Sequence, residues 1–401
     1  METDMAEWQT VRLSKIVSTN QSTYSPKEDW QFANYLDTGN ITMNQIDEIQ
    51  YINTSADKLP SRARRKVKLN SIIYSTVRPN QLHYGIIKKQ PENFLVSTGF
   101  VVIDVDFEKA VPDYIYYVLT QKEVTEHLQA IAEQSVSAYP SIKPSDIENL
   151  ELFLPDRITQ EKIVAILNSI DKKIKQNNEI NNNLEQQVLT IYRHNFVDTS
   201  NELRQICRAD EYFDISIGKT PPRKEPQWFS TNSEDITWVS ISDMGTCGLY
   251  ISNSSEKLTK QAINRHNVKV VPDNTVLLSF KLTVGRVAIT DGEVTTNEAI
   301  AHFKTDKKEI NEYLYCYLKY FNYQTMGSTS SIATAVNSKI IKGMPFIVPT
   351  DTELKEFHNF TAPIFAKIKS NQLERDNLTA LRDALLPKLM SGELDISNIE
   401  L

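Results

Sequence analysis

Residues 160–196, with the sequence QEKIVAILNSIDKKIKQNNEINNNLEQQVLTIYRHNF, contain neither glycine nor proline. Apolar side chains recur along this stretch at spacings of three and four residues, and two asparagines continue the series near its middle. The series is Ile163, Leu167, Ile170, Ile174, Asn177, Asn181, Leu184, Val188 and Ile191. It is typical of the a and d positions of a coiled coil and predicts one long helix. At about 1.5 Å per residue this helix would be roughly 55 Å long, which indicates a spacer.

A second series lies 194 residues further along the chain and is less regular. It consists of Phe357, Thr361, Ile364, Ile368, Asn371, Arg375, Leu378, Arg382 and Leu385. Pro363 falls inside it and predicts a kink or a late restart of the helix. Asn177 and Asn371 occupy equivalent positions, and a buried asparagine in such a seam commonly fixes register and partner. We therefore predict that the two helices pair, with burial against neighbouring domains as the alternative.

The segments outside the helices are also duplicated. Ser55–Leu59 (SADKL) reappears as Ser254–Leu258 (SSEKL), and Tyr114–Leu119 reappears as Tyr313–Leu318, both at an offset of 199 residues. Repeats on this scale indicate repeated structural units. The predicted order is globular, helix, globular, helix.

Each globular half combines short apolar runs with helical patches, so the predicted fold class is mixed α/β. The expected strands include Ser71–Tyr74, Phe100–Ile103, Val276–Leu278 and Arg286–Ile289, and the expected helices include Asp113–Thr120 and Asn311–Lys319. The order of the strands cannot be predicted from these patterns. The predicted domains are residues 1–155, a central helix 156–197, residues 198–350, and a C-terminal helix with its tail, 351–401.

Composition is that of an ordinary globular protein, with 40% apolar residues and eleven glycines. The three cysteines, Cys207, Cys247 and Cys316, are widely spaced and form no CxxC motif, so we expect three free thiols. The first residues do not resemble a signal peptide, and no segment approaches the roughly 20 apolar residues that span a bilayer. We expect a cytoplasmic protein without a membrane partner.

The net charge of −7 argues at first against a nucleic-acid partner. Residues 58–89, however, contain no acidic residue and nine basic ones: Lys58, Arg62, Arg64, Arg65, Lys66, Lys68, Arg78, Lys88 and Lys89. The equivalent stretch of the second half carries Lys257, Lys260, Arg265, Lys269, Lys281 and Arg286. Local patches bind phosphate whatever the net charge, although a single basic run is more often solvated surface. Two basic windows at matching positions favour one surface that is used twice.

Catalytic motifs are missing from the sequence. It contains no Asn-Pro-Pro-Phe or Asp-Pro-Pro-Tyr, no glycine-rich nucleotide loop, no HExxH and no Gly-x-Ser-x-Gly. Asp104 and Asp106 alternate with apolar residues, which is typical of the outward face of a strand and not of a metal pair. We predict neither a catalytic site nor a metal site.

The whole chain resembles the specificity subunits of type I restriction-modification systems. The motifs that carry the resemblance are Leu154–Leu167 (LPDRITQEKIVAIL), Leu385–Leu394 (LLPKLMSGEL), Gly218–Pro222 (GKTPP), Trp238–Asp243 (WVSISD) and Ser279–Arg286 (SFKLTVGR), with Gly327–Ser-Thr329 following. Their order agrees with the duplication. The first half departs from the pattern, because Thr19–Ser22 stands where Gly-Lys-Thr-Pro is expected.

The resemblance implies a non-catalytic subunit with two target-recognition domains, each of which recognises one part of a split, asymmetric DNA site. The helices would set the unread spacer and dock two modification subunits, which bind S-adenosylmethionine and methylate adenine N6. A separate restriction subunit would supply the motor. One alternative is a specificity subunit of a fused restriction-methyltransferase outside type I. Another is a coiled-coil scaffold that binds protein or carbohydrate, but a scaffold does not predict matching basic windows.

Candidate DNA contacts follow from these windows, since lysine and arginine attract phosphate and polar loops can reach base edges. In the first half we predict phosphate contacts from Arg62, Arg64, Arg65 and Lys66. Contacts nearer the bases are predicted for Arg78, Gln81, Tyr84 and Ser137. In the second half the candidates are Lys219, Arg223, Lys224, Lys281, Thr283, Arg286, Ser328 and Ser330.

Overall fold

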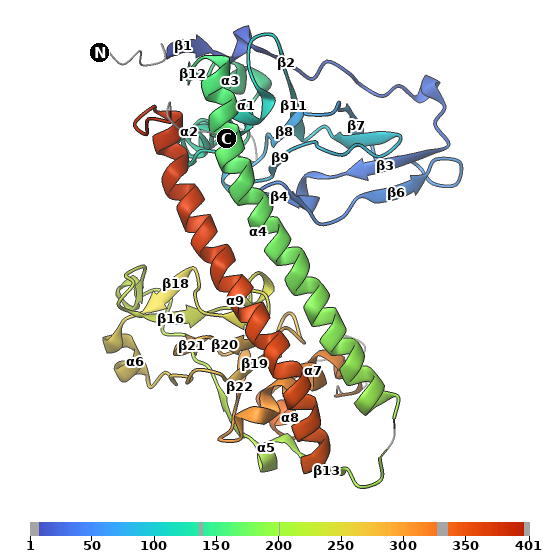
Figure 1. The fold of residues 1–401 in the computed structure, drawn as a ribbon, viewed down its shortest axis with the longest axis vertical. Helices are drawn as coiled ribbons and strands as arrows, with labels where there is room; N and C mark the ends of the chain where they lie inside the picture. The colour runs from blue at the N-terminus through green and yellow to red at the C-terminus, as the bar shows by residue number, and fades with distance from the viewer. Residues whose placement is uncertain (1–7, 136–138, 200, 327–335, 397–401) are drawn as a thin grey trace. The chain divides into compact units, whose positions relative to one another are not determined.

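The computed structural model describes residues 8–135, 139–199, 201–326 and 336–396 of the 401-residue chain. These form two compact units, a first unit of Met1–Lys172 with Leu378–Leu401 and a second unit of Lys173–Asn377. Both boundaries lie inside long helices, α4 (Arg157–Tyr192) and α9 (Asp351–Met390) (Figure 1). Each unit therefore contains one segment of each helix.

The first unit has two four-stranded sheets. One has the order β2 (Val17–Thr19), β11 (Phe100–Val105), β8 (Ile72–Ser75) and β9 (Tyr84–Ile86), and the other β6 (Gln50–Asn53), β3 (Phe32–Leu36), β10 (Phe94–Ser97) and β7 (Ala63–Lys66). All neighbours are antiparallel except β3 and β10. Two-stranded pairs join β1 (Gln9–Arg12) to β12 (Glu151–Leu154) and β4 (Ile41–Thr42) to β5 (Gln45–Ile46). The helices are α1 (Pro112–Leu119), α2 (Lys122–Glu133) and α3 (Pro144–Glu148).

The second unit repeats the central strands of this arrangement and differs from the first unit at the edges of its sheets. Its five-stranded sheet has the order β14 (Asp214–Ile217), β22 (Ile300–Lys304), β19 (Val276–Ser279), β20 (Val287–Thr290) and β17 (Tyr250–Ile251). Its four-stranded sheet has the order β15 (Phe229–Ser230), β18 (Glu256–Leu258), β16 (Ile236–Val239) and β21 (Val294–Thr296). The parallel pair β16–β21 corresponds to β3–β10, and β13 (Gln205–Arg208) with β23 (Pro345–Val348) corresponds to β1–β12. The helices are α5 (Ala209–Tyr212), α6 (Lys260–His266), α7 (Asn311–Tyr320) and α8 (Ser338–Lys342). The added strands are β15 and β17, and in chain order α6 follows β18 where β7 follows β6 in the first unit.

Equivalent residues perform equivalent tasks in the two units. The Tyr114 hydroxyl donates to the Phe153 carbonyl at 2.8 Å, and the Tyr313 hydroxyl donates to the Ile347 carbonyl at the same distance. The central strands β8 and β19 are buried along their whole length, which explains their unbroken apolar sequences. The predicted mixed α/β class, the duplication and the strands and helices named above are confirmed.

The two long helices pair within each unit, as predicted. In the second unit Asn371 Nδ2 donates to Asn181 Oδ1 at 2.8 Å. In the first unit Arg382 contacts Asp171 at 3.1 Å. The apolar stripes are buried beside these contacts, with Ile163 at 1% and Ile368 at 1% exposure. Ile163 and Ile368 belong to the cores of their units, so the stripe also packs against the domains, which was the alternative to pairing.

The predicted restart at Pro363 is wrong, because α9 continues through it from Asp351 to Met390. Proline removes one backbone hydrogen bond and costs a helix interior about 3 kcal/mol. Burial of Phe357, Phe365 and Ile368 on the same helix offsets that cost. Tertiary packing overrides the local preference here.

Candidate nucleic-acid interface

Three of the predicted phosphate contacts lie on β7, the last strand of its sheet. Arg64, Arg65 and Lys66 are half-buried and Arg62, just before the strand, is exposed. Because side chains alternate along a strand, Arg64 and Lys66 share one face and Arg65 points to the other. The basic run is thus divided between two faces of one strand.

Lys66 already has a partner inside the protein. Its ammonium group forms an ion pair with Glu28 and lies 5.1 Å from the centre of the Trp30 ring. The hydrogen bond from Lys66 is the main cause that lowers the pKa of Glu28. Lys66 would have to share or leave this carboxylate to bind phosphate, and its role in DNA binding stays a prediction.

Arg65 differs from its neighbours because its Nε is buried and has no hydrogen-bond partner among the described residues. Burial lowers the pKa of its guanidinium group. An unpaired buried donor costs free energy, and an incoming acceptor would remove that cost. Among the three cations of β7, Arg65 is therefore the one with a buried donor that is not hydrogen-bonded.

The loop between β8 and β9 presents polar groups at the surface of the first unit. Arg78 and Gln81 are exposed, as predicted for a loop. They line a cavity of about 350 Å³ together with Asn80, Gln129 and Pro140. The Arg78 guanidinium also lies 5.6 Å from the Tyr139 ring centre. The cavity therefore combines guanidinium and amide donors, the groups that hydrogen-bond to base edges.

Tyr84 does not belong to this surface, so the prediction of a base contact is wrong for it in this structure. It lies on β9 and is only 4% exposed. Its ring stacks on Tyr74 at 5.5 Å, and burial raises the pKa of its hydroxyl to about 12. The strand begins at Tyr84 itself, which turns the aromatic ring into the core.

The loop between β19 and β20 is the counterpart in the second unit. Lys281 and Thr283 are exposed on it. Arg286 is half-buried, and its Nη1 donates to the Ile241 carbonyl at 2.5 Å. Arg286 therefore anchors the loop to its own domain, and a direct contact with DNA stays a prediction for it.

A serine closes both loops in the same way, which the sequence analysis missed. Ser75 donates its backbone N–H to His83 and Ser279 donates its own to Arg286, each at 2.9 Å. The Ser279 hydroxyl also accepts from the Arg286 N–H at 3.0 Å and donates to the Thr283 carbonyl at 2.6 Å. The signal was available, since each serine ends an aligned apolar strand.

The Gly-Lys-Thr-Pro-Pro segment is held against β21. A Cβ atom at Gly218 would lie 2.0 Å from Thr296 Oγ1, so only glycine allows this approach. Thr296 Oγ1 is itself 2.7 Å from His302 Nε2, and burial lowers the pKa of this histidine to about 3. A neutral buried histidine thus supports the segment. Lys219 within the segment and Lys224 just after it are exposed.

Arg223, directly after this segment, contacts other side chains of the protein. Its Nη1 donates to both carboxylate oxygens of Glu256 at 2.8 Å. The guanidinium lies 4.2 Å from the Phe229 ring centre and 4.5 Å from that of Trp238. These contacts explain Arg223 as part of the domain, and its predicted DNA contact stays untested. Ser137, Ser328 and Ser330 lie outside the described residues.

The two asparagines predicted to set the helix register are both buried, Asn177 at 1% and Asn371 at 2% exposure. They do not bond to each other. Asn177 donates to Glu374 at 3.0 Å, while Asn371 donates to Asn181. Each asparagine therefore has a different partner across the seam, and the predicted role in register is untested.

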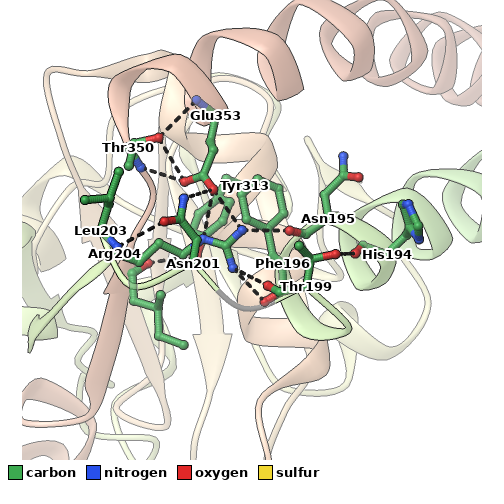
Figure 2. Close-up of polar contacts among 11 residues, drawn as sticks. His194, Asn195, Phe196, Thr199, Asn201, Leu203, Arg204, Tyr313, Thr350 and Glu353 are labelled. Atoms are coloured by element: carbon green, nitrogen blue, oxygen red, sulfur yellow. Dashed lines mark hydrogen bonds and ion pairs between the residues drawn. The ribbon is translucent and has the colours of Figure 1, made fainter.

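A polar cluster ties the segment after α4 to the start of α9 in the second unit (Figure 2). Arg204 donates to the carbonyls of Asn195, Phe196 and Thr199 and, from Nε and Nη2, to Glu353. Burial would raise the pKa of Glu353, but hydrogen bonds from Arg204, Asn201 and Thr350 outweigh it and lower the pKa to about 2. A cavity of about 730 Å³ adjoins the cluster. We interpret the cluster as a clamp on the chain after α4.

Among the described residues, no three metal-binding side chains come together and no helix is long and apolar enough to cross a membrane. Asp104 accepts from the Ser71 hydroxyl at 2.5 Å and pairs with Lys68, whereas Asp106 pairs with Lys109. The two aspartates thus serve separate local contacts.

Comparison with known proteins identifies the family that this chain resembles. The family model described as type I restriction modification DNA specificity domain matches twice, over residues 5–186 and 202–378. The HindI specificity subunit of Haemophilus influenzae is 25% identical, over 97% of this chain and all of that protein. The MjaIX specificity subunit of Methanocaldococcus jannaschii is 26% identical, over 79% of this chain and 76% of that protein.

A solved structure shares the fold. The S subunit of a type I restriction-modification system from M. genitalium matches 99% of both chains, with 14% identity and a TM-score of 0.55. The two family matches together cover most of the chain and coincide with its internal repeat. The chain therefore belongs to the type I restriction-modification DNA specificity domain family.

Proposed function

We propose that this chain recognises a bipartite, asymmetric DNA site, one part with each unit. The observation that carries the proposal is the repeat of one loop on two equivalent sheets. Both loops are closed by a serine, but their exposed side chains differ, with Arg78 and Gln81 on one and Lys281 and Thr283 on the other. The same scaffold with different polar tips suits two different half-sites.

The proposal assigns chemistry to partner subunits. Two modification subunits would dock on the helices, bind S-adenosylmethionine and methylate adenine N6, and a restriction subunit would join them for cleavage. The long helices support this assignment, because their exposed faces carry residues that the seam does not use, such as Ile180 at 44% and Leu381 at 48% exposure. This chain would supply recognition alone.

Mapping modified adenines across a genome tests the proposal directly. The chain is expressed with its modification subunits in cells that lack other adenine methylation. We expect methylation confined to one split sequence that contains a fixed number of unspecified bases. Expression of the modification subunits alone is the control and should leave the DNA unmodified.

Two results would contradict the proposal. Methylation that does not depend on this chain would remove its role in recognition. An absence of DNA binding, together with capture of a protein or carbohydrate by the purified chain, would favour the scaffold. A partner that carries methyltransferase and nuclease on one polypeptide would instead favour the fused type of enzyme.

A further inference from the structure

Leu282 has the most exposed large apolar side chain among the described residues, at 97%. It stands at the tip of the β19–β20 loop between Lys281 and Thr283, which are also exposed. Single exposed apolar residues are common on protein surfaces and need no explanation by themselves. The backbone of Leu282 gives the reason to look further.

Leu282 has a φ of +59°, in the left-handed region that L-residues other than glycine, asparagine and aspartate rarely adopt. Asparagine or glycine would fit this position with less strain, and glycine does occur three residues later at Gly285, with a φ of +93°. Strained residues of this kind persist where the surrounding structure determines them, and they cluster at ligand-binding sites. A leucine here is unfavourable for the backbone and for solvation alike.

The loop is fixed at its base, so Leu282 is held outward. Ser279 binds the loop at three points: its hydroxyl contacts the Thr283 carbonyl and the Arg286 N–H, and its carbonyl accepts from Gly285 at 3.0 Å. Arg286 then ties the end of the loop to Ile241. The tip can therefore enter a groove with little loss of conformational entropy.

The neighbouring groups match the edges and backbone of DNA. Lys281 supplies a positive charge and Thr283 a hydroxyl group beside Leu282. The loop thus presents a cation, a hydroxyl and an apolar group within three residues. The cation and the hydroxyl group can contact DNA phosphates, and the apolar side chain between them can contact an apolar group on a base.

We propose that Leu282 is a specificity-determining residue of the second unit and contacts the C5 methyl group of a thymine in the major groove. The thymine methyl is the apolar group that B-DNA exposes on base edges there. The equivalent loop of the first unit carries Arg78, Asn80 and Gln81 at its surface and would hydrogen-bond instead. This inference rests on the proposed function and adds the chemistry of one contact.

The test uses the complex of this chain with its modification subunits and a duplex that carries the mapped site. Each thymine of the site is replaced in turn by deoxyuridine, which lacks only the methyl group. For one thymine we expect a loss of affinity of about three- to tenfold, the scale of one buried methyl contact. Leu282→Ala should lower the affinity for the original, thymine-containing duplex by a similar factor. On the duplex with deoxyuridine at that position, the same substitution should lower the affinity no further. Leu282→Met should restore most of the affinity, while Leu203→Ala, a 77% exposed leucine of the same unit, is the matched control.

Two outcomes overturn the inference while leaving the proposed function intact. One is unchanged affinity of Leu282→Ala for its site. The other is a loss of affinity from Leu282→Ala that is the same on every deoxyuridine duplex as on the original duplex. The two changes would then act independently, and Leu282 would contact no thymine methyl group. If the unsubstituted complex binds no specific duplex, the proposed function is contradicted as well. That result is seen in the first measurement, before any Leu282 variant is used.

Discussion

Glu353 shows at the scale of one residue how the chain after α4 is held. It accepts hydrogen bonds from Arg204, Asn201 and Thr350, and the pKa of its carboxyl group falls from 4.5 to about 2. A carboxyl group with a lowered pKa stabilises the fold above its unfolded pKa, and that contribution disappears as the pH falls toward the folded pKa. We therefore expect the free energy of unfolding to lose up to about 3 kcal/mol from this group between about pH 4.5 and pH 2.

Urea unfolding of the full chain at pH 7, 5 and 3 measures this contribution. Glu353→Gln should be less stable than the natural chain at pH 7, and the difference should shrink toward pH 3. Glu356→Gln, an exposed carboxylate on the same helix, is the control and should change little. A Glu353→Gln deficit that is the same at every pH would show that charge on this residue is not what stabilises the clamp.

At the scale of elements, we propose that the paired helices set the length of the unread spacer. Asn177 contacts Glu374 and Asn181 contacts Asn371, so the two helices run antiparallel through this segment of the second unit. Seven residues inserted in one helix would shift these partners by about 10 Å and break the seam. Matched insertions after Asn177 and after Leu373 would preserve the pairing. We expect the matched variant to methylate a site whose unread spacer is longer by about three base pairs.

Adenine mapping in cells checks this prediction, with thermal unfolding as a measure of folding. A single insertion after Asn177 should lower the melting temperature and abolish modification. A matched variant that folds and modifies the original site would contradict the role of the helices in spacing. The result tests the helices separately from the β8–β9 and β19–β20 loops, which both variants leave unchanged.

At the scale of the whole molecule, a net charge of −7 coexists with two basic windows. Changing Arg62, Arg64 and Arg65 together to glutamine should weaken DNA binding by the assembled methyltransferase. The slope of log K against log salt should fall in magnitude by up to about 2.7 if all three bind phosphate. Lys15, Lys122 and Lys143, exposed cations of the same unit outside the basic window, provide a control triple. An unchanged slope would exclude this strand from the interface.

Much of the architecture could be predicted because it depends on local periodicity. The helix stripes, the buried strands and the repeat all leave marks at short spacing or at a constant offset. The orientation of individual side chains could not. Tyr84 turns inward because strand β9 begins there, and Lys66 and Arg223 are occupied by Glu28 and Glu256. Those acids lie 38 and 33 residues away in sequence, so no local pattern reveals them.

The division of the chain has a consequence for its synthesis. Leu389 and Met390 belong to the core of the first unit, whereas the second unit is one continuous segment, Lys173–Asn377. The unit that the ribosome begins first is therefore completed last. At about 5–20 residues per second, its core waits roughly 10–40 s for the final helix. During that interval the nascent chain exposes the apolar surface that α9 later covers. Translation that stops before Leu389 would therefore damage the first unit, although the missing residues lie far from most of it in sequence.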